Sequence, residues 1–265
     1  GLTEVTGVHV HDGGIGMNGP VAFPLTDAGN GTYVLAETTI SPSNLDALTS
    51  GEWYLNVHTT ANPSGEVRGQ IIPDTTAVVT FSLSGSQEVP AVDTMAMGSG
   101  YALFDTTNNN VSLVAVTTID NATMAHIHTG FAGVNGPVLE ALVESDETAG
   151  VWMTDGSVML DEATATQLLS GGHYVNVHTA AFTGGEIRGQ ITPDNIEVYG
   201  IIADGLQEVP AVTTTASGAG AFTLNTSTGA LSGSVTITGM TANMAHIHEG
   251  EAGVNGGVLL GLTDD

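Results

Sequence analysis

Apolar and polar residues alternate with a period of two along several short stretches, which is typical of β-strands with one buried face. Asn108, Asn109 and Asn110 separate two such stretches, so these two are expected to form a hairpin around an asparagine-rich turn. The alternating stretches cover residues 79–83, 101–104, 111–116, 174–178, 186–191, 221–224 and 231–237. The pattern therefore predicts a chain built almost entirely of strands.

Two stretches with helical signals interrupt the strands. Asp161 is expected to cap a helix over residues 162–169 that stops at Gly171, because a carboxylate before a helix accepts a hydrogen bond from its first turn. Ser43 is expected to cap a second helix over residues 45–49 that stops at Gly51.

Three segments recur at one common spacing and divide the chain into repeats. Residues 88–92 recur at 208–212, residues 56–59 recur at 176–179, and residues 65–71 recur at 185–191. Residues 75–194 hold the complete repeat, residues 1–74 only its C-terminal half, and residues 195–265 only its N-terminal half. About eight strands in a repeat of about 120 residues predict an all-β fold of tandem antiparallel Greek-key β-sandwich domains, each with one short helix.

Three His-x-His pairs occupy equivalent places in these segments. Residues i and i+2 of a strand point to the same face, so each pair offers two imidazoles to one metal ion. The alternative is a pair of exposed or hydrogen-bonded histidines without a metal. The pairs are His9 and His11, His126 and His128, and His246 and His248.

A further histidine follows two of the pairs in a repeated Asn-Val-His segment. His58 and His178 complete two sets of three if their strands lie beside the His-x-His strands. Three imidazoles suit copper, zinc or nickel, whereas calcium prefers carboxylates. His173 lies five residues before His178, faces the other side of its strand and has Trp53 in its place in the first repeat, so it is not expected to be a ligand.

The charge balance narrows the choice of partners. The chain has 28 acidic residues and two basic ones, with a net charge of −26, which excludes a basic nucleic-acid-binding surface. Such a charge predicts self-repulsion that cations relieve. The acidic residues either keep the protein soluble or bind divalent cations such as calcium. No stretch is apolar for the 18–20 residues or so that a membrane span needs.

Several other repeated polar residues have a structural and a functional interpretation. Glu186 and Arg188, like Glu66 and Arg68, are expected to form a partly buried ion pair that fixes a turn, or else the arginine orients an anion near the metal. Asn56 and Asn176 are expected to orient the backbone, and Glu88 and Glu208 to cap a bend rather than act as a general acid.

These residues together resemble the CHRD (chordin-type) domain. The resemblance covers the whole chain and rests on the order of Gln-Glu-Val-Pro (87–90), Ala-His-Ile-His-Thr-Gly (125–130), Gly-Val-Asn-Gly-Pro (133–137), 171–179 and 185–191. It implies an extracellular β-domain with no well-defined enzymatic role. The first repeat departs from the pattern, with Val8 in place of alanine and Asp12 after its histidines.

The histidine pattern is also similar to the copper half of Cu,Zn superoxide dismutases, another Greek-key sandwich. This resemblance implies one copper site of His9, His11 and His58, and another of His126, His128 and His178. The bridging histidine and the zinc ligands of the dismutases have no counterpart here, so a dinuclear enzyme site is not supported.

Two functions follow as hypotheses. In the first, the chain is a secreted structural protein at the cell surface, and terminal half-domains of neighbouring copies complete each other head to tail into a filament or biofilm matrix. In the second, it is a copper-binding protein with dismutase-like or copper-storage activity; an enzyme is the less favoured reading. The starting Gly1 and the half-repeats also fit an excerpt of a longer array. In either case His246 and His248 need a third histidine from elsewhere.

Overall fold

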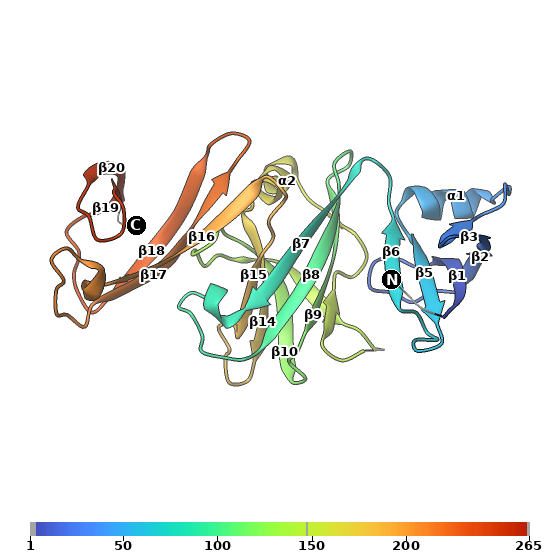
Figure 1. Ribbon diagram of the computed structural model, residues 1–265, viewed down its shortest axis with the longest axis horizontal. Coiled ribbons are helices and arrows are strands. Elements are labelled where there is room, and N and C mark those ends of the chain that lie inside the picture. The colour runs from blue at the N-terminus through green and yellow to red at the C-terminus, as the bar shows by residue number, and fades with distance from the viewer. Residues whose placement is uncertain (1–3, 147, 264–265) are drawn as a thin grey trace.

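The computed structural model describes residues 4–146 and 148–263 of the chain. Three β-rich segments lie in a row along the long axis of the molecule, with the N-terminal segment at one end and the C-terminal segment at the other (Figure 1).

The N-terminal segment carries a four-stranded sheet in the order β2-β1-β5-β6 and a separate hairpin, β3-β4. The strand pairs within it are antiparallel. Its elements are β1 (Val5–Asp12), β2 (Val21–Pro24), β3 (Thr26–Gly29), β4 (Thr32–Val34), α1 (Pro42–Thr49), β5 (Trp53–Thr59) and β6 (Val67–Ile71).

The central segment is a nine-stranded antiparallel sheet in the order β12-β11-β10-β14-β15-β7-β8-β9-β13. Because β12 also pairs with β9, eight of these strands close into a ring. Its elements are β7 (Thr76–Ser84), the 3₁₀ helix η1 (Gly85–Gln87), β8 (Met97–Asp105), β9 (Asn110–Thr117), β10 (Ala122–Thr129), β11 (Val138–Glu144), β12 (Val151–Met153), β13 (Val158–Met159), α2 (Glu162–Leu169), β14 (His173–Thr179) and β15 (Ile187–Gln190).

The C-terminal segment repeats the start of the central one. It has a three-stranded sheet, β16-β17-β18, and a hairpin, β19-β20. Its elements are β16 (Ile196–Asp204), the 3₁₀ helix η2 (Gly205–Gln207), β17 (Ser217–Asn225), β18 (Leu231–Thr238), β19 (Ala245–Glu249) and β20 (Gly257–Leu262). Ser234 of β18 donates a hydrogen bond of 2.8 Å to the carbonyl of Gly133, which joins this segment to a loop of the central barrel.

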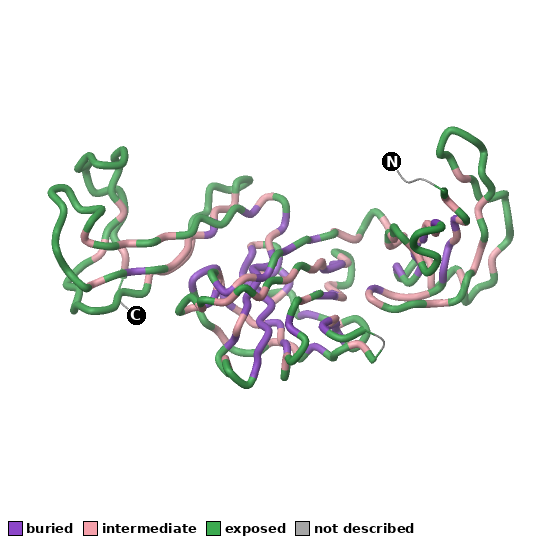
Figure 2. Tube along the Cα trace, turned by 60° about the horizontal axis from the view of Figure 1, so that its bottom comes forward, coloured by how far each residue is buried: buried purple, intermediate pink, exposed green. Residues whose placement is uncertain are grey.

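Period-two alternation builds the core of the central barrel. Ile127 of β10, Val175 of β14 and Ile187 of β15 point inward, and all are buried. They pack in one cluster with Val79 of β7 and Leu113 of β9. Burial is concentrated in this barrel, and the end segments are largely exposed (Figure 2). The other face of β10, β14 and β15 is polar and carries the candidate metal ligands.

Both predicted helices are present, but the start of the first one was wrong. Asp161 caps α2 as predicted, by accepting a hydrogen bond from the Thr164 amide. In α1 the cap is Ser41 rather than Ser43, because the helix begins at Pro42, three residues before the predicted start, and the Asn44 amide donates to Ser41 Oγ. Proline fits the first turn, where its missing N–H is not needed.

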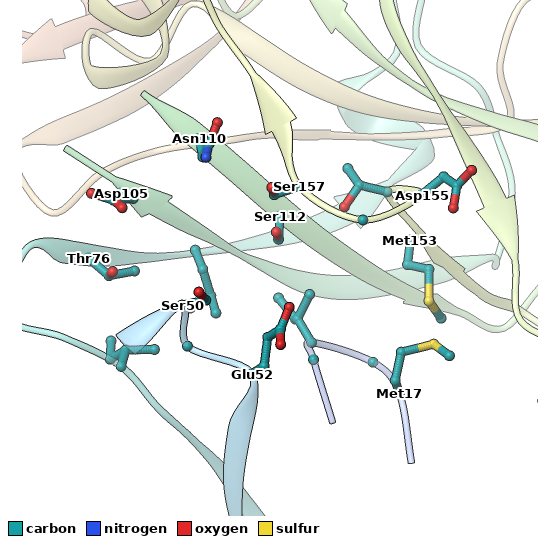
Figure 3. Close-up of a pocket in the computed structure, with 18 of the residues that line it drawn as sticks. Met17, Ser50, Glu52, Thr76, Asp105, Asn110, Ser112, Met153, Asp155 and Ser157 are labelled. Carbon is teal, nitrogen blue, oxygen red and sulfur yellow. The ribbon is translucent and has the colours of Figure 1, made fainter. Parts of the chain in front are cut away.

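The N-terminal segment touches the central barrel through a small apolar cluster of Ile15, Leu103, Val114 and Met153. Beside it lies a cavity of about 690 Å³, into which both segments contribute polar and acidic side chains such as Glu52, Asp105 and Asp155 (Figure 3). The residues that line it, all within the described ranges, include no histidine, so the cavity is separate from the candidate metal ligands.

The all-β tandem architecture is thus confirmed, while the Greek-key connection stays a prediction. Among residues 4–146 and 148–263, no helix has the length and apolar character needed to cross a bilayer.

Candidate metal centres

The strand register brings His-x-His pairs and later histidines together. In the central barrel, His126 and His128 lie on one face of β10, and His178 lies on the neighbouring β14. Antiparallel pairing sets Asn176 opposite His126 and Tyr174 opposite His128, so residues of both strands share this face. In the N-terminal segment, β1 and β5 bring His9, His11 and His58 together in the same way.

Both predicted sets of three histidines form compact groups. We call His9, His11 and His58 the N-terminal triad, and His126, His128 and His178 the central triad. In each triad, one ring nitrogen from every histidine lies within 4.8 Å of the others. The rings of the central triad are 5.1 to 6.1 Å apart, centre to centre, and those of the N-terminal triad 4.9 to 5.8 Å. A single ion between them can reach all three.

Backbone carbonyls fix how four of these rings are turned. The Nδ1 atoms of His128 and His178 lie 2.9 and 3.1 Å from the carbonyl oxygens of Gly136 and Thr183. His11 and His58 lie against the carbonyls of Gly19 and Pro63, both at 2.9 Å. A carbonyl only accepts, so Nδ1 carries the proton and the Nε2 lone pair is left free, as in metal-bound histidines.

Three of the four freed nitrogens are buried and have no partner. Nε2 of His11, His58 and His128 makes no hydrogen bond. A buried nitrogen without a partner costs free energy, which a bound ion recovers. In the central triad, His126 Nδ1 lies 3.2 Å from His178 Nε2, so two ring nitrogens already point at one another.

Burial favours the neutral form of four of these histidines, and the neutral imidazole is the form that binds a metal. Burial is the largest cause that lowers the pKa of His126, His128 and His178, and the neighbouring histidines lower it further for His128 and His178. Burial also lowers the pKa of His9, with His58 and His11 adding to the effect. Protons therefore compete weakly with a metal at these positions.

In each triad, a tyrosine ring stacks on one histidine and an arginine lies over the same tyrosine. Tyr174 stacks on His128, and the guanidinium of Arg188 lies over the same tyrosine ring. Arg188 also donates to the carbonyls of Phe131 and Val134, which belong to the loop between β10 and β11. Tyr54 and Arg68 repeat this stack beneath His11 in the N-terminal segment.

The loop that supplies the Gly136 carbonyl is held tightly. A Cβ added at Gly136 would lie 1.6 Å from the Thr129 carbonyl oxygen, so only glycine fits. Tyr174 Oη accepts a hydrogen bond from the Gly136 amide, and Asn135 donates to the Val89 carbonyl. The repeated Gly-Val-Asn-Gly and Glu-Val-Pro segments thus meet beside the triad.

The predicted glutamate–arginine ion pairs were wrong. Glu186 accepts hydrogen bonds from Thr94 and Thr179, while Arg188 turns to backbone carbonyls and to Gln190. Glu66 likewise accepts from Thr59 and Asn62, and Arg68 donates to the carbonyls of Gly14 and Met17. Three aligned carbonyl and amide oxygens satisfy the planar guanidinium without a carboxylate.

Glu88 is the acidic group that faces Arg188. Its backbone caps the 3₁₀ helix η1 at this bend, because its amide donates to the Gly85 carbonyl, as predicted. It is buried, and its carboxylate accepts a hydrogen bond of 3.4 Å from Asn176 Nδ2. Burial raises the pKa of Glu88 to about 7, although Arg188 and Asn176 act in the opposite direction. Each of them recurs at the common repeat spacing, Glu88 as Glu208 and Asn176 as Asn56, and this separate recurrence is the signal in the sequence that could have marked them.

The remaining histidines behave differently. His246 and His248 lie together on β19 with their rings 5.8 Å apart, and no third histidine joins them among the described residues. His173 is fully buried on the core side of β14 and takes no part in a triad, as predicted. Within the described ranges, no cluster of carboxylates suited to calcium accompanies the two triads.

Comparison with known proteins gives one clear result. The model of the CHRD domain family matches residues 1–71, 79–191 and 199–265, and these three matches cover nearly the whole chain. No curated protein and no solved structure matches it.

Proposed function

The chain belongs to the CHRD domain family, and on that premise we propose that it is an extracellular structural protein that binds two copper ions, one at the N-terminal triad and one at the central triad. The observation that carries this proposal is the orientation of the rings. In both triads, backbone carbonyls hold two Nδ1 atoms and leave buried Nε2 atoms without partners.

Copper is favoured over zinc on chemical grounds. Nitrogen ligands hold Cu²⁺ more tightly than Zn²⁺ in the general order of divalent metal affinities. Imidazole sets without a thiolate or carboxylate match copper well, and the acidic surface concentrates divalent cations near the sites. Zinc is the second candidate.

Calorimetric titration of the full-length chain tests this proposal. We expect two tight Cu²⁺ sites per chain, of which one is lost in a His126→Ala/His128→Ala variant. The matched variant His246→Ala/His248→Ala should keep both, because that pair has no third histidine. Equal binding by the wild type and the His126→Ala/His128→Ala variant would overturn the central site.

Three histidines leave a fourth coordination position, open to a weak further donor or to a substrate, when a metal is bound. An open position is what copper storage by exchange or dismutase-like activity requires. The chain's own contribution is to hold the three rings and to keep Arg188 behind Tyr174, close to the site but buried. Measured superoxide turnover by the copper-loaded chain decides between storage and activity.

A second function, self-assembly, is favoured by exposed positions in the end segments. Val111 of β9 is 3% exposed, whereas Leu231, its counterpart in β18, is 44% exposed. Ile187 of β15 is fully buried, whereas Val67, its counterpart in β6, is 49% exposed. We propose that the β16–β18 sheet of one copy covers the β5–β6 sheet of the next and produces a head-to-tail filament or matrix.

The central barrel supplies the register for this contact. There β15 pairs with β7, with Arg188 opposite Ser84, and Glu88 covers Asn176. The same arrangement between copies would set Arg68 opposite Asp204 and bring Glu208 over Asn56. Opposite charges then meet at an interface between chains that otherwise repel each other.

Sedimentation velocity of the full chain over a range of concentrations tests assembly. We expect species larger than a monomer, and we expect Glu208→Arg to reduce them because it places a second cation beside Arg68. Glu251→Arg makes the same charge change at another exposed glutamate and should assemble normally. A chain that stays monomeric throughout, or two variants that behave alike, would overturn this contact.

A further inference from the structure

We infer that Met124 is a fourth, thioether ligand of the central triad, which raises the affinity of this site for monovalent copper, and that the N-terminal triad lacks such a ligand. The inference rests on the proposed metal function and adds the oxidation state that each site prefers. It depends on the strand register around one exposed methionine.

The register places Met124 beside two of the three histidines. Met124 and His126 are two residues apart on β10, so their side chains share a face. On the neighbouring strand, His178 lies directly opposite Met124. Side chains opposite each other in an antiparallel pair have Cβ atoms about 4.5–5.5 Å apart, within reach of a methionine sulfur. His126 Nδ1 and His178 Nε2 themselves lie 3.2 Å apart.

Packing does not account for this methionine. Met124 is 46% exposed and lies on the polar face, whereas the core residues of β10 are Ala125 and Ile127 on the other face. Its three rotatable bonds let the sulfur turn toward the triad at little cost. The C-terminal pair has the same residue type two positions before its first histidine, at Met244.

The N-terminal triad differs at this one position. Gly7 lies opposite His58, as Met124 lies opposite His178. A Cβ added at Gly7 would lie 2.9 Å from His9 Cε1 and 3.1 Å from His9 Nε2. The ring of His9 therefore lies over the place where a side chain would start, and no thioether can enter from this position.

The chemistry of the donors explains the predicted selectivity. Thioether sulfur is a soft ligand that favours Cu(I), whereas imidazole alone suits the divalent ions of copper and zinc. Three neutral imidazoles and one neutral thioether leave the positive charge of the ion unbalanced, which a monovalent ion tolerates better than a divalent one in a partly buried site. The two triads of one chain should thus differ in their preferred oxidation state.

Competition titration with a chromophoric Cu(I) chelator tests the inference in a His58→Ala background, where only the central triad is complete. Met124→Leu keeps the shape but removes the sulfur, and we expect Cu(I) affinity to fall roughly 10- to 100-fold, comparable to loss of a supporting group at a metal site. Zn²⁺ affinity should not change. Met159→Leu, at a remote exposed methionine, is the matched control.

X-ray absorption at the copper edge gives a second readout that does not depend on affinity. A sulfur scatterer in the His58→Ala parent that disappears in Met124→Leu supports the inference. Unchanged Cu(I) affinity and no sulfur scatterer would overturn it while leaving the triads as metal sites. Equal losses of Cu(I) and Zn²⁺ affinity would also overturn it, since they indicate a packing role. Absence of metal binding in the parent would overturn the proposed function itself.

Discussion

The guanidinium carbon of Arg188 lies 3.5 Å from the centre of the Tyr174 ring, and the same ring stacks on His128. A buried cation thus supports a histidine of the central triad through an aromatic ring. The stack recurs as Arg68, Tyr54 and His11, with 3.4 Å between the guanidinium carbon and the tyrosine ring. The two copies differ in burial, since Arg188 is 1% exposed and Arg68 is only partly buried.

This difference predicts unequal effects of the same substitution. Arg188→Lys should lower the free energy of unfolding by about 2–3 kcal/mol, because a lysine cannot reach both loop carbonyls and Gln190 at once. Arg68→Lys should lower the free energy of unfolding by clearly less, because water reaches the hydrogen-bond partners of Arg68. Urea unfolding of the two variants checks this, and equal losses would contradict the stacked, buried role of Arg188.

Gly136→Ala should weaken metal binding at the central triad roughly 10- to 100-fold. The new Cβ meets the Thr129 carbonyl, so the loop must shift and the Gly136 carbonyl moves away from His128 Nδ1. Gly184→Ala, where an added Cβ has open space, is the control. Copper titration that gives the same central-site affinity for both variants would show that this carbonyl does not orient the ring.

His173 should make stability depend on pH. Burial lowers its pKa to about 4, below the 6.5 of an exposed histidine, so the folded state binds fewer protons than the unfolded chain. The contribution of neutral His173 to the free energy of unfolding is complete above pH 6.5 and is lost as the pH falls toward 4. Relative to His173→Phe, the wild type should lose about 3 kcal/mol across this window. Parallel stability curves for the two proteins would exclude this effect.

Bound metal should stabilise the fold. An ion that binds only the folded state, at a free concentration 100 times its dissociation constant, adds about 2.7 kcal/mol. Thermal unfolding with and without a chelator should therefore show a higher melting temperature for the copper-loaded chain. A His11→Ala/His128→Ala variant should lose most of this difference, and an undiminished shift would place the metal elsewhere.

The features that repeat or alternate along the sequence could be predicted. The strands, the three segments and both triads follow from period-two patterning and from the common spacing of His58 and His178. The closure of the barrel could not be predicted from the sequence. It depends on the pairing of β12 with β9, and residues 151–153 of β12 carry no signal for that pairing. The predicted ion pair of Glu186 and Arg188 was wrong because the spacing of two residues in a strand does not reveal which other groups compete for them. The competing carbonyls of Phe131 and Val134 belong to a loop that is distant in the sequence.

Native mass spectrometry of the copper-loaded full chain tests the central claim most directly, because it counts bound ions in each variant. We predict two retained copper ions in the wild type, one in His58→Ala, one in His178→Ala, and none in the double variant. A double variant that retains as many ions as the wild type would contradict the assignment of the triads as the metal sites.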